Sequence, residues 1–568
     1  MRRTSAWAVF LLALLVLGFG FLTPLGLVIR NGFISPDGRF TWAYLLGVFR
    51  NPVYLEGFGN SLRLALGTTL LATCIALPLA WLANRFTFPG KKCVSALLLV
   101  PMILPPFVGA IGFQQIFGQY GVLNALLGLQ VDWLGRGRWV GVILLQALAL
   151  YPVLYLNLAA ALANVDHAME EAAENLGATG WTKFRRITLP LMMPGFFAGG
   201  TIVFIWSFTE LGTPLIMNYT RCASVQVYDA LKEIGGNPFP FALVFVMLSV
   251  SVLLYALSKA LFGGRAYAMA GKAATVFQET RATGWRGLAV LAPFLLVISL
   301  ALLPHWGVLL TSFSPPGAWY RTVLPEAFTF ANYGEALGHS MTVSSIRNSL
   351  VFSLLAVAFN LTFGIAIAFV VVRSTLRLRG LLDGLAMMPL AVPGLVMASG
   401  LLALSAWLSN TAAVRAYPVV GQWLDVKSNP TVFLVLAYGI RRLPYMVRAA
   451  VAGLQQTSAG LEEAAANLGA PPLTSLRRIT LPLITANLIA GALLAFAFSM
   501  LEVSDSLMLA QREDFYPITK TIYELFQLLG TGKYLAAALG VWAMVFLAVT
   551  LVGSSLLLGK KLGALFRV

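Results

Sequence analysis

Three acidic and two basic residues lie inside long apolar stretches of this chain. The acids are Glu210, Glu502 and Asp505, and the bases are the adjacent Arg441 and Arg442. Ionisable side chains within apolar, membrane-spanning segments usually face a cavity, a partner or a transport path. Carboxylate oxygens suit hard metal cations, and guanidinium groups suit carboxylates and other anions. These residue types therefore predict ion binding and not catalysis.

The acids admit two interpretations. Glu210 and Glu502 are 292 residues apart, and each lies deep in an expected helix, over residues 192–214 and 484–509. Asp505 follows Glu502 by three residues, which predicts that both lie on one helical face. Either the carboxylates line the path of a cationic or metal-bearing substrate, or they form structural pairs with an arginine or with the backbone.

The arginines also admit two interpretations. At the 292-residue spacing, Ala149 and Leu150 stand where Arg441 and Arg442 stand. Unpaired carboxylates in a narrow pore repel one another, so either a cation or the two arginines are expected to neutralise them. The alternative is that the arginines select an anion.

A polar segment occurs twice at the same spacing. "EEAAENLGATGWTKFRRITLPL" begins at Glu170 and "EEAAANLGAPPLTSLRRITLPL" begins at Glu462, with 16 of 22 positions identical. Asp166 and Ser458 suit helix N-caps, and the glutamates that follow suit the first turn. The glycines that come next suit a helix stop with positive φ. The segment predicts a short, polar helix that needs a partner to pack against.

The composition indicates a membrane protein. Of the 568 residues, 59% are hydrophobic and 11% are charged, against about 25% charged in soluble domains. Apolar runs long enough to span a bilayer recur, so we expect an all-α membrane protein and no β-barrel. The twelve expected spans are 7–29, 59–83, 94–117, 139–162, 192–214, 241–262, 287–311, 347–371, 381–407, 431–454, 484–509 and 536–558.

The spacing divides the chain into two homologous halves of six spans each. The first half is residues 1–275 with its polar segment at 166–190, and the second is residues 276–568 with its polar segment at 458–482. An even number of spans makes the repeats parallel. The Lys and Arg bias of the loops predicts that both termini and both polar segments lie in the cytoplasm.

Several features argue against other classes. The net charge of +17 follows from basic loops of a membrane protein and does not indicate nucleic-acid binding. The three cysteines and three histidines are scattered, so no firm metal site is predicted. The first 30 residues are interpreted as a retained helix, because their apolar run is too long for a signal peptide.

The repeated pattern EEAAxNLGA followed by RRITLPL resembles the cytoplasmic EAA loop of binding-protein-dependent ABC importer permeases, and the chain resembles the fold of type I ABC importers. In that family the loop forms a coupling helix that docks on the ATP-hydrolysing subunit. The resemblance assigns coupling to Glu170, Glu171, Ala172, Ala173, Gly177, Glu462, Glu463, Ala464, Ala465 and Gly469.

The family resemblance implies partners. The chain has no G-x-x-x-x-G-K-[ST] motif, so ATP and Mg are expected on a separate ATPase and this chain is not expected to be an enzyme. Two ATPase copies, a periplasmic substrate-binding protein and membrane lipid are the implied partners, in a bacterial inner membrane. A secondary transporter is the alternative class, but it has no use for two docking helices.

Fusion of two halves and the stretches "LPPFVGAIGFQQIFGQYGVLN" and "SFTELGTPLIM" resemble the ferric iron permease group. The second half departs from this pattern, with "EVSDS" where the first has "ELGTP". Thiamine, phosphonate or polyamine remain alternative substrates, and the arginines would suit a phosphonate or a ferric–anion complex.

Overall fold

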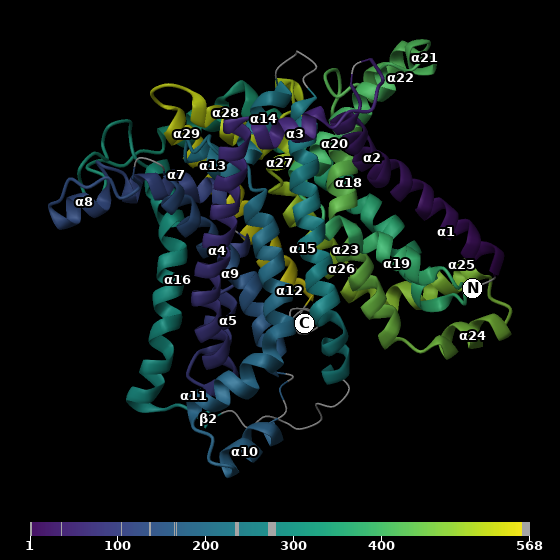
Figure 1. The fold of residues 1–568 in the computed structure, drawn as a ribbon, viewed down its shortest axis with the longest axis horizontal. Coiled ribbons are helices and arrows are strands. Elements are labelled where there is room, and N and C mark those ends of the chain that lie inside the picture. Colours follow the sequence, from purple (N-terminus) through teal and green to yellow (C-terminus); the bar gives the residue numbers. More distant parts are fainter. Residues whose placement is uncertain are drawn as a thin grey trace.

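The structure, a computed structural model, describes residues 3–558 except 36, 104, 136, 137, 164, 166, 233–237 and 271–279. The described part is almost entirely helical (Figure 1), with one pair of two-residue parallel strands, β1 (Phe86–Thr87) and β2 (Thr280–Arg281). The expected boundary between the halves, at residues 275 and 276, lies outside the described residues.

In the first half, five of the six expected spans are long helices, and the third is made of shorter ones. Its long helices are α1 (Arg3–Leu17), η1 (Gly18–Leu22) and α2 (Thr23–Phe33), which are continuous, then α4 (Pro52–Arg85), α9 (Trp139–Ala163), α12 (Leu189–Phe208) and α15 (Phe239–Ala270). Its shorter helices are α3 (Ala43–Arg50), α5 (Lys91–Leu97), α6 (Val100–Ile103), α7 (Pro106–Phe117), α8 (Val122–Leu127), α10 (His167–Asn175), α11 (Gly180–Lys183), η2 (Phe184–Thr188), α13 (Gly212–Ile216) and α14 (Ala223–Lys232).

The second half repeats this order. Its long helices are α16 (Gly284–Ser312), α18 (Ser340–Arg373), α20 (Gly394–Ser409), α23 (Thr431–Gln456), α26 (Leu481–Met500) and α29 (Gly532–Leu558). Its shorter helices are α17 (Ala331–Gly338), α19 (Arg379–Met387), η3 (Met388–Leu390), α21 (Ala412–Arg415), α22 (Pro418–Leu424), α24 (Ala459–Asn467), α25 (Pro472–Ser475), η4 (Leu476–Thr480), α27 (Ser504–Leu509), η5 (Glu513–Phe515) and α28 (Ile518–Gln527).

The third span of each half is broken, which corrects the continuous helices expected over 94–117 and 381–407. The chain bends by 93° between Lys91–Met102 and Pro106–Leu127, and by 104° between Arg379–Leu390 and Gly394–Ser409. The residues that precede α7 and α20, Pro105 and Pro393, have extended backbones. A proline in a helix lacks the N–H for one hydrogen bond and clashes with the preceding turn, so it favours a bend or a break at that position.

The described residues agree with a polytopic membrane protein. Nine of their helices are long and apolar enough to cross a bilayer, and each bent pair supplies one more. α23 is as long, with 26 residues, but it carries Arg441, Arg442 and Arg448. With α23 the total is the twelve spans predicted.

The first span of each half packs on the other half, an exchange that the sequence did not predict. α1 lies against α18 and α19, whereas α16 lies against α7 and α9. Glycines allow these helices to approach closely. Gly112 of α7 contacts the backbone of α16 at Pro304, and Gly400 of α20 contacts the backbone of α2 at Pro24. Figure 1 shows α1 and α16 on opposite flanks of the molecule.

One core joins the two halves at one end, whereas two separate cores occupy the other end, each built from one half and the first span of the other half. The shared core joins helices such as α7, α13 and α14 of the first half to α20, α27 and α28 of the second. Toward the end that carries α10 and α24, one core joins α4 and α9 to α16, and another joins α18 and α23 to α1. The structure is therefore closed between the halves at the end that carries α14 and α28.

Candidate functional site

The two copies of the polar segment form α10 and α24, here called the repeat helices, which lie in the lower part of Figure 1. Gly177 and Gly469 follow them with φ of +79° and +82°, the left-handed conformation predicted for the helix stop. Ser458 caps α24, as predicted, by accepting a 3.2 Å hydrogen bond from the Gly460 N–H. Asp166, the other expected cap, lies outside the described residues.

Each repeat helix turns one face toward the protein and one away. Glu170, Ala173 and Ala465 are buried, and Glu462 is half-buried. The first glutamate of each segment thus faces inward instead of toward an external partner. The remaining residues assigned to coupling are exposed: Glu171, Ala172, Gly177, Glu463, Ala464 and Gly469.

A leucine at the end of each repeat helix projects away from the protein. Leu176 is 89% exposed and Leu468 is 90% exposed. The turn beside Leu176 is held by Lys183, which donates a hydrogen bond to Glu174 and lowers the pKa of that carboxyl. Two equivalent apolar side chains on polar helices suit insertion into pockets of a partner.

A cavity of about 210 Å³ lies between the halves. Its wall is built from equivalent positions of the two halves, because many of its residues occur in pairs at the spacings of 288 and 292. These pairs are Pro101 and Pro389, Pro105 and Pro393, Ala149 and Arg441, Leu150 and Arg442, Trp206 and Phe498, and Glu210 and Glu502. The cavity therefore lies on the pseudo-two-fold axis that relates the halves.

Glu210 and Glu502 are in breaks between helices, which corrects the prediction that they lie deep within a helix. α12 ends at Phe208 and α26 at Met500, and the short helices α13 and α27 follow. Asp505 is in the first turn of α27, so it does not share a continuous helix with Glu502. The two breaks meet, because a Cβ on Gly212 would lie 2.8 Å from a methyl group of Val503.

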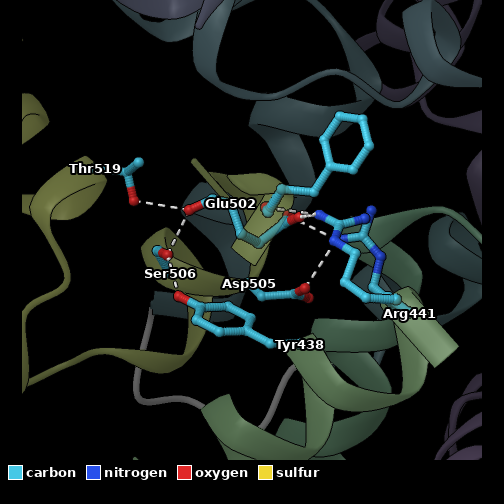
Figure 2. A network of polar contacts seen from close by, with 8 residues as sticks. Tyr438, Arg441, Glu502, Asp505, Ser506 and Thr519 are labelled. Atoms are coloured by element: carbon cyan, nitrogen blue, oxygen red, sulfur yellow. Dashed lines mark hydrogen bonds and ion pairs between the residues drawn. The ribbon is translucent and has the colours of Figure 1, made fainter. Parts of the chain in front are cut away.

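The second half holds its charges in a compact network (Figure 2). Arg441 Nη1 lies 2.6 Å from Glu502 Oε1 and donates a 2.8 Å hydrogen bond to Asp505 Oδ2. Arg442 pairs with the other oxygen of Glu502 and donates a 3.1 Å hydrogen bond to the Phe498 carbonyl. The predicted pairing of the arginines with a carboxylate thus takes place, with Glu502 and Asp505.

Hydroxyl groups hold the backbone at Glu502 in place. Ser506 and Thr519 both donate to the Glu502 carbonyl, the latter at 2.7 Å, and the Tyr438 hydroxyl lies 2.6 Å from Ser506 Oγ. In Figure 2, Thr519 and Ser506 lie on the side of Glu502 away from Arg441, and Tyr438 lies below Ser506. The break after α26 is therefore a fixed structure that aims the carboxylate.

Glu210 has no such network. Within the part of the chain that the structure describes, its side chain accepts hydrogen bonds from the Thr213 N–H and hydroxyl, at 3.3 and 3.4 Å, and forms no ion pair. Glu210, Glu502, Arg441 and Arg442 line the cavity, and the buried Asp505 lies beside the wall on Arg441, so the five groups together carry a formal charge of −1. No group of three or more His, Cys, Asp or Glu suited to a resident metal occurs among the described residues.

Gln146 is a cavity residue that sequence reasoning missed. Its Oε1 accepts a 3.2 Å hydrogen bond from Thr68 and another from Ser207, which leaves its Nε2 without a partner among the described residues. The only sequence signal was a polar residue inside an apolar span. An amide donor and an acid, Glu210, thus line the first-half side of the cavity.

These features define a class of protein: a membrane protein of two homologous halves, with a cavity on their axis and two polar helices at one end. The chain belongs to the family of binding-protein-dependent transport system inner membrane components. The family model matches it twice, over residues 72–267 and 360–555. The second match is shifted by 288 residues, which is the spacing of the pairs Pro101 and Pro389, and Pro105 and Pro393, in the cavity wall.

Curated relatives cover most of the chain. The ferric transport system permease protein FbpB of Actinobacillus pleuropneumoniae is 25% identical over 81% of this chain and 64% of its own length. A putative ferric transport system permease protein, FbpB 1 of Haemophilus influenzae, is 26% identical over 82% of this chain and 70% of its own. The molybdenum transport system permease protein ModB of Escherichia coli K12 is 31% identical over 35% of this chain and 91% of its own. The chain thus spans just under two thirds of the first of these relatives.

Proposed function

We propose that this chain is the membrane-spanning permease subunit of an ATP-driven importer, and that its substrate is ferric iron. A periplasmic binding protein would deliver the substrate to the end that carries α14 and α28. A separate ATPase, with its ATP and Mg, would bind the repeat helices in the cytoplasm. Both chain termini would lie on that cytoplasmic side of a bacterial inner membrane.

The arrangement of cores supports an alternating-access mechanism. One core joins both halves at the α14 and α28 end, whereas the two cores toward α10 and α24 are separate from each other. In this proposal the structure is closed to the periplasm. Closure of an ATPase dimer would draw the repeat helices together and open the opposite end.

The observation that carries the proposal is the axial cavity with Glu210 and Glu502 in its wall. Carboxylate oxygens are hard ligands that suit a hard cation, and the net negative charge of the five groups would attract it. The arginines that hold Glu502 would keep the empty cavity near neutrality. The names of the relatives that match over most of the chain agree with a ferric substrate.

The test is uptake of radioactive iron by proteoliposomes that contain the full complex of permease, ATPase and binding protein. Glu210→Gln is the cleaner variant, because Glu210 forms no ion pair with any residue that the structure describes, whereas Glu502 pairs with both arginines. We expect uptake to fall at least tenfold in Glu210→Gln and further in the double variant with Glu502→Gln, while basal ATP hydrolysis persists. Glu335→Gln, an exposed acid on α17, is the matched control. Unchanged uptake in the double variant would refute the path assignment.

A second candidate is import of an oxyanion. Arg441 and Arg442 line the same cavity, and a relative that matches one half is named a molybdenum permease. An oxyanion would have to compete with Glu502 and Asp505 for these guanidinium groups. Competition of molybdate and of ferric iron for uptake in the same proteoliposomes distinguishes the two candidates.

A further inference from the structure

An ion pair joins the repeat helix of the first half to the membrane helices. Arg85 Nη2 lies 2.7 Å from Glu170 Oε2 and 2.8 Å from its Oε1, and the Thr188 hydroxyl donates to Oε1 at 2.6 Å. The Glu170 side chain is only 5% exposed. Charge-assisted hydrogen bonds of this kind are among the strong ones in proteins.

The second half repeats the arrangement with the equivalent residues. Arg373 Nε lies 3.2 Å from Glu462 Oε1, and the Thr480 hydroxyl donates to the same oxygen at 3.2 Å. Arg373 also donates a 2.9 Å hydrogen bond to the Thr457 carbonyl, just before α24. The glutamates and the threonines are each 292 residues apart, and the arginines are 288 apart.

The three partners come from three different elements. Arg85 and Arg373 are the last residues of α4 and α18, which cross most of the molecule. The glutamates lie near the start of the repeat helices, and the threonines end the π-helical turns η2 and η4 that lead into α12 and α26. α12 and α26 end at the breaks that carry Glu210 and Glu502, so each clamp lies between a repeat helix and the cavity.

We propose that Arg85 and Arg373 are positioning residues for coupling: each clamps its repeat helix to two membrane helices so that they move as one body. This inference rests on the proposed function, because it assumes that a partner pushes on the repeat helices. It assigns the first glutamate of each segment to the inside of the clamp. Contact with the partner is left to Glu171, Glu463 and the exposed leucines.

The duplication separates this role from incidental packing. A single buried pair is weak evidence for any role, because desolvation offsets much of the attraction. Two clamps with the same residue types at equivalent positions have the same purpose in both halves. Removal of one member strands a buried carboxylate, so the effect is expected to be large and local to the repeat helix.

The first test uses the full chain alone in nanodiscs and needs no partner. We expect hydrogen exchange of the α10 amides to accelerate at least tenfold in Arg85→Ala, and exchange in α24 to stay unchanged. Glu170→Gln, which keeps the shape, should act in the same direction. The exchanged pair Arg85→Glu with Glu170→Arg should restore slow exchange. Arg221→Ala, which removes an exposed pair with Glu56, is the control.

The second test measures iron taken up per ATP hydrolysed by the reconstituted complex. We expect this ratio to fall severalfold in Arg85→Ala with Arg373→Ala, while ATP hydrolysis continues, and the charge-exchanged variants to recover it. Unchanged exchange in α10, or no rescue by the charge exchange, would overturn the clamp. Altered exchange with rescue, but no ATP-dependent uptake in the unmodified complex, would retain the clamp and refute the proposed function.

Discussion

Tyr228 and Lys520 are equivalent residues of the two halves, 292 positions apart, and they touch each other: Lys520 Nζ lies 3.5 Å from the Tyr228 hydroxyl. Equivalent residues of two-fold-related halves can meet only near the axis. The contact is therefore on the axis at the end where α14 packs beside α28. Lys520 is buried there, with its ammonium 2.8 Å from Glu524 and within 6.0 Å of the rings of Tyr228, Tyr516 and Tyr523.

This contact has to open if substrate enters the cavity from that end. In a variant without Cys74, Cys93 and Cys222, cysteines at positions 228 and 520 can be joined by a short reducible cross-linker. We expect cross-linking to reduce uptake at least tenfold and reduction to restore it, because the halves cannot separate while tied. Each single-cysteine variant treated in the same way is the control. Full uptake by the cross-linked protein would show that this end does not open.

Gly394 provides a test of the charge network that leaves every charged residue in place. A Cβ at this position would lie 2.6 Å from Arg441 Nη1 and 2.8 Å from its Cζ. We expect Gly394→Ala to displace the guanidinium and weaken its pairing with Glu502 and Asp505, with a loss of about 1–3 kcal/mol of stability. Thermal unfolding in detergent measures the effect.

Gly384→Ala is the control for that change, because a Cβ on this glycine of α19 meets nothing within 4 Å. It should be neutral or slightly stabilising, since alanine favours helix over glycine. Equal melting temperatures for the two variants would mean that the Arg441 position is not constrained by Gly394.

The glycines that follow the repeat helices should determine the orientation of those helices. Gly177 and Gly469 have positive φ and open space around them, so a valine there strains the backbone without causing a clash. The strain is roughly 1 kcal/mol or more per site. We expect the double variant to insert normally and to hydrolyse ATP with little uptake. Gly180→Ala, three residues beyond Gly177 and without positive φ, is the control; normal uptake in the double variant contradicts the prediction.

The sequence predicted the features that repetition makes visible. The two halves, the repeat helices with their glycine stops and the equivalent depths of Glu210 and Glu502 all follow from one spacing. The breaks at Glu210 and Glu502 were not predicted, although Gly212, Pro214, Ser504 and Ser506 beside them are residue types that favour turns. Exchange of α1 and α16 between the halves also left no signal, since uniformly apolar helices do not specify their neighbours.

The sequence also indicated only part of what the charged residues do. Arg85 and Arg373 stood at equivalent positions, but as loop charges they indicated only the side of the membrane. The 292-residue spacing identifies equivalent residues of the two halves, such as Glu210 and Glu502. Arg441 and Arg442 have neutral counterparts, and they pair with acids of their own half. The pairing depends on the backbone turn at Glu502, which brings Asp505 and Glu502 to one guanidinium group, and the sequence did not show that turn.

The last prediction concerns the number of partners. One chain presents two repeat helices, each with its own exposed leucine, Leu176 or Leu468, and its own inward clamp. If an ATPase subunit docks on one repeat helix, a single copy of this chain therefore offers two equivalent docking sites. We expect native mass spectrometry of the purified complex to give one copy of this chain with two ATPase subunits. Leu468→Asp should leave one ATPase bound and Leu176→Asp should do the same, because each introduces a charge into one docking contact only. Two copies of this chain per ATPase pair, or full occupancy in both aspartate variants, would contradict the view that a single chain supplies both docking helices.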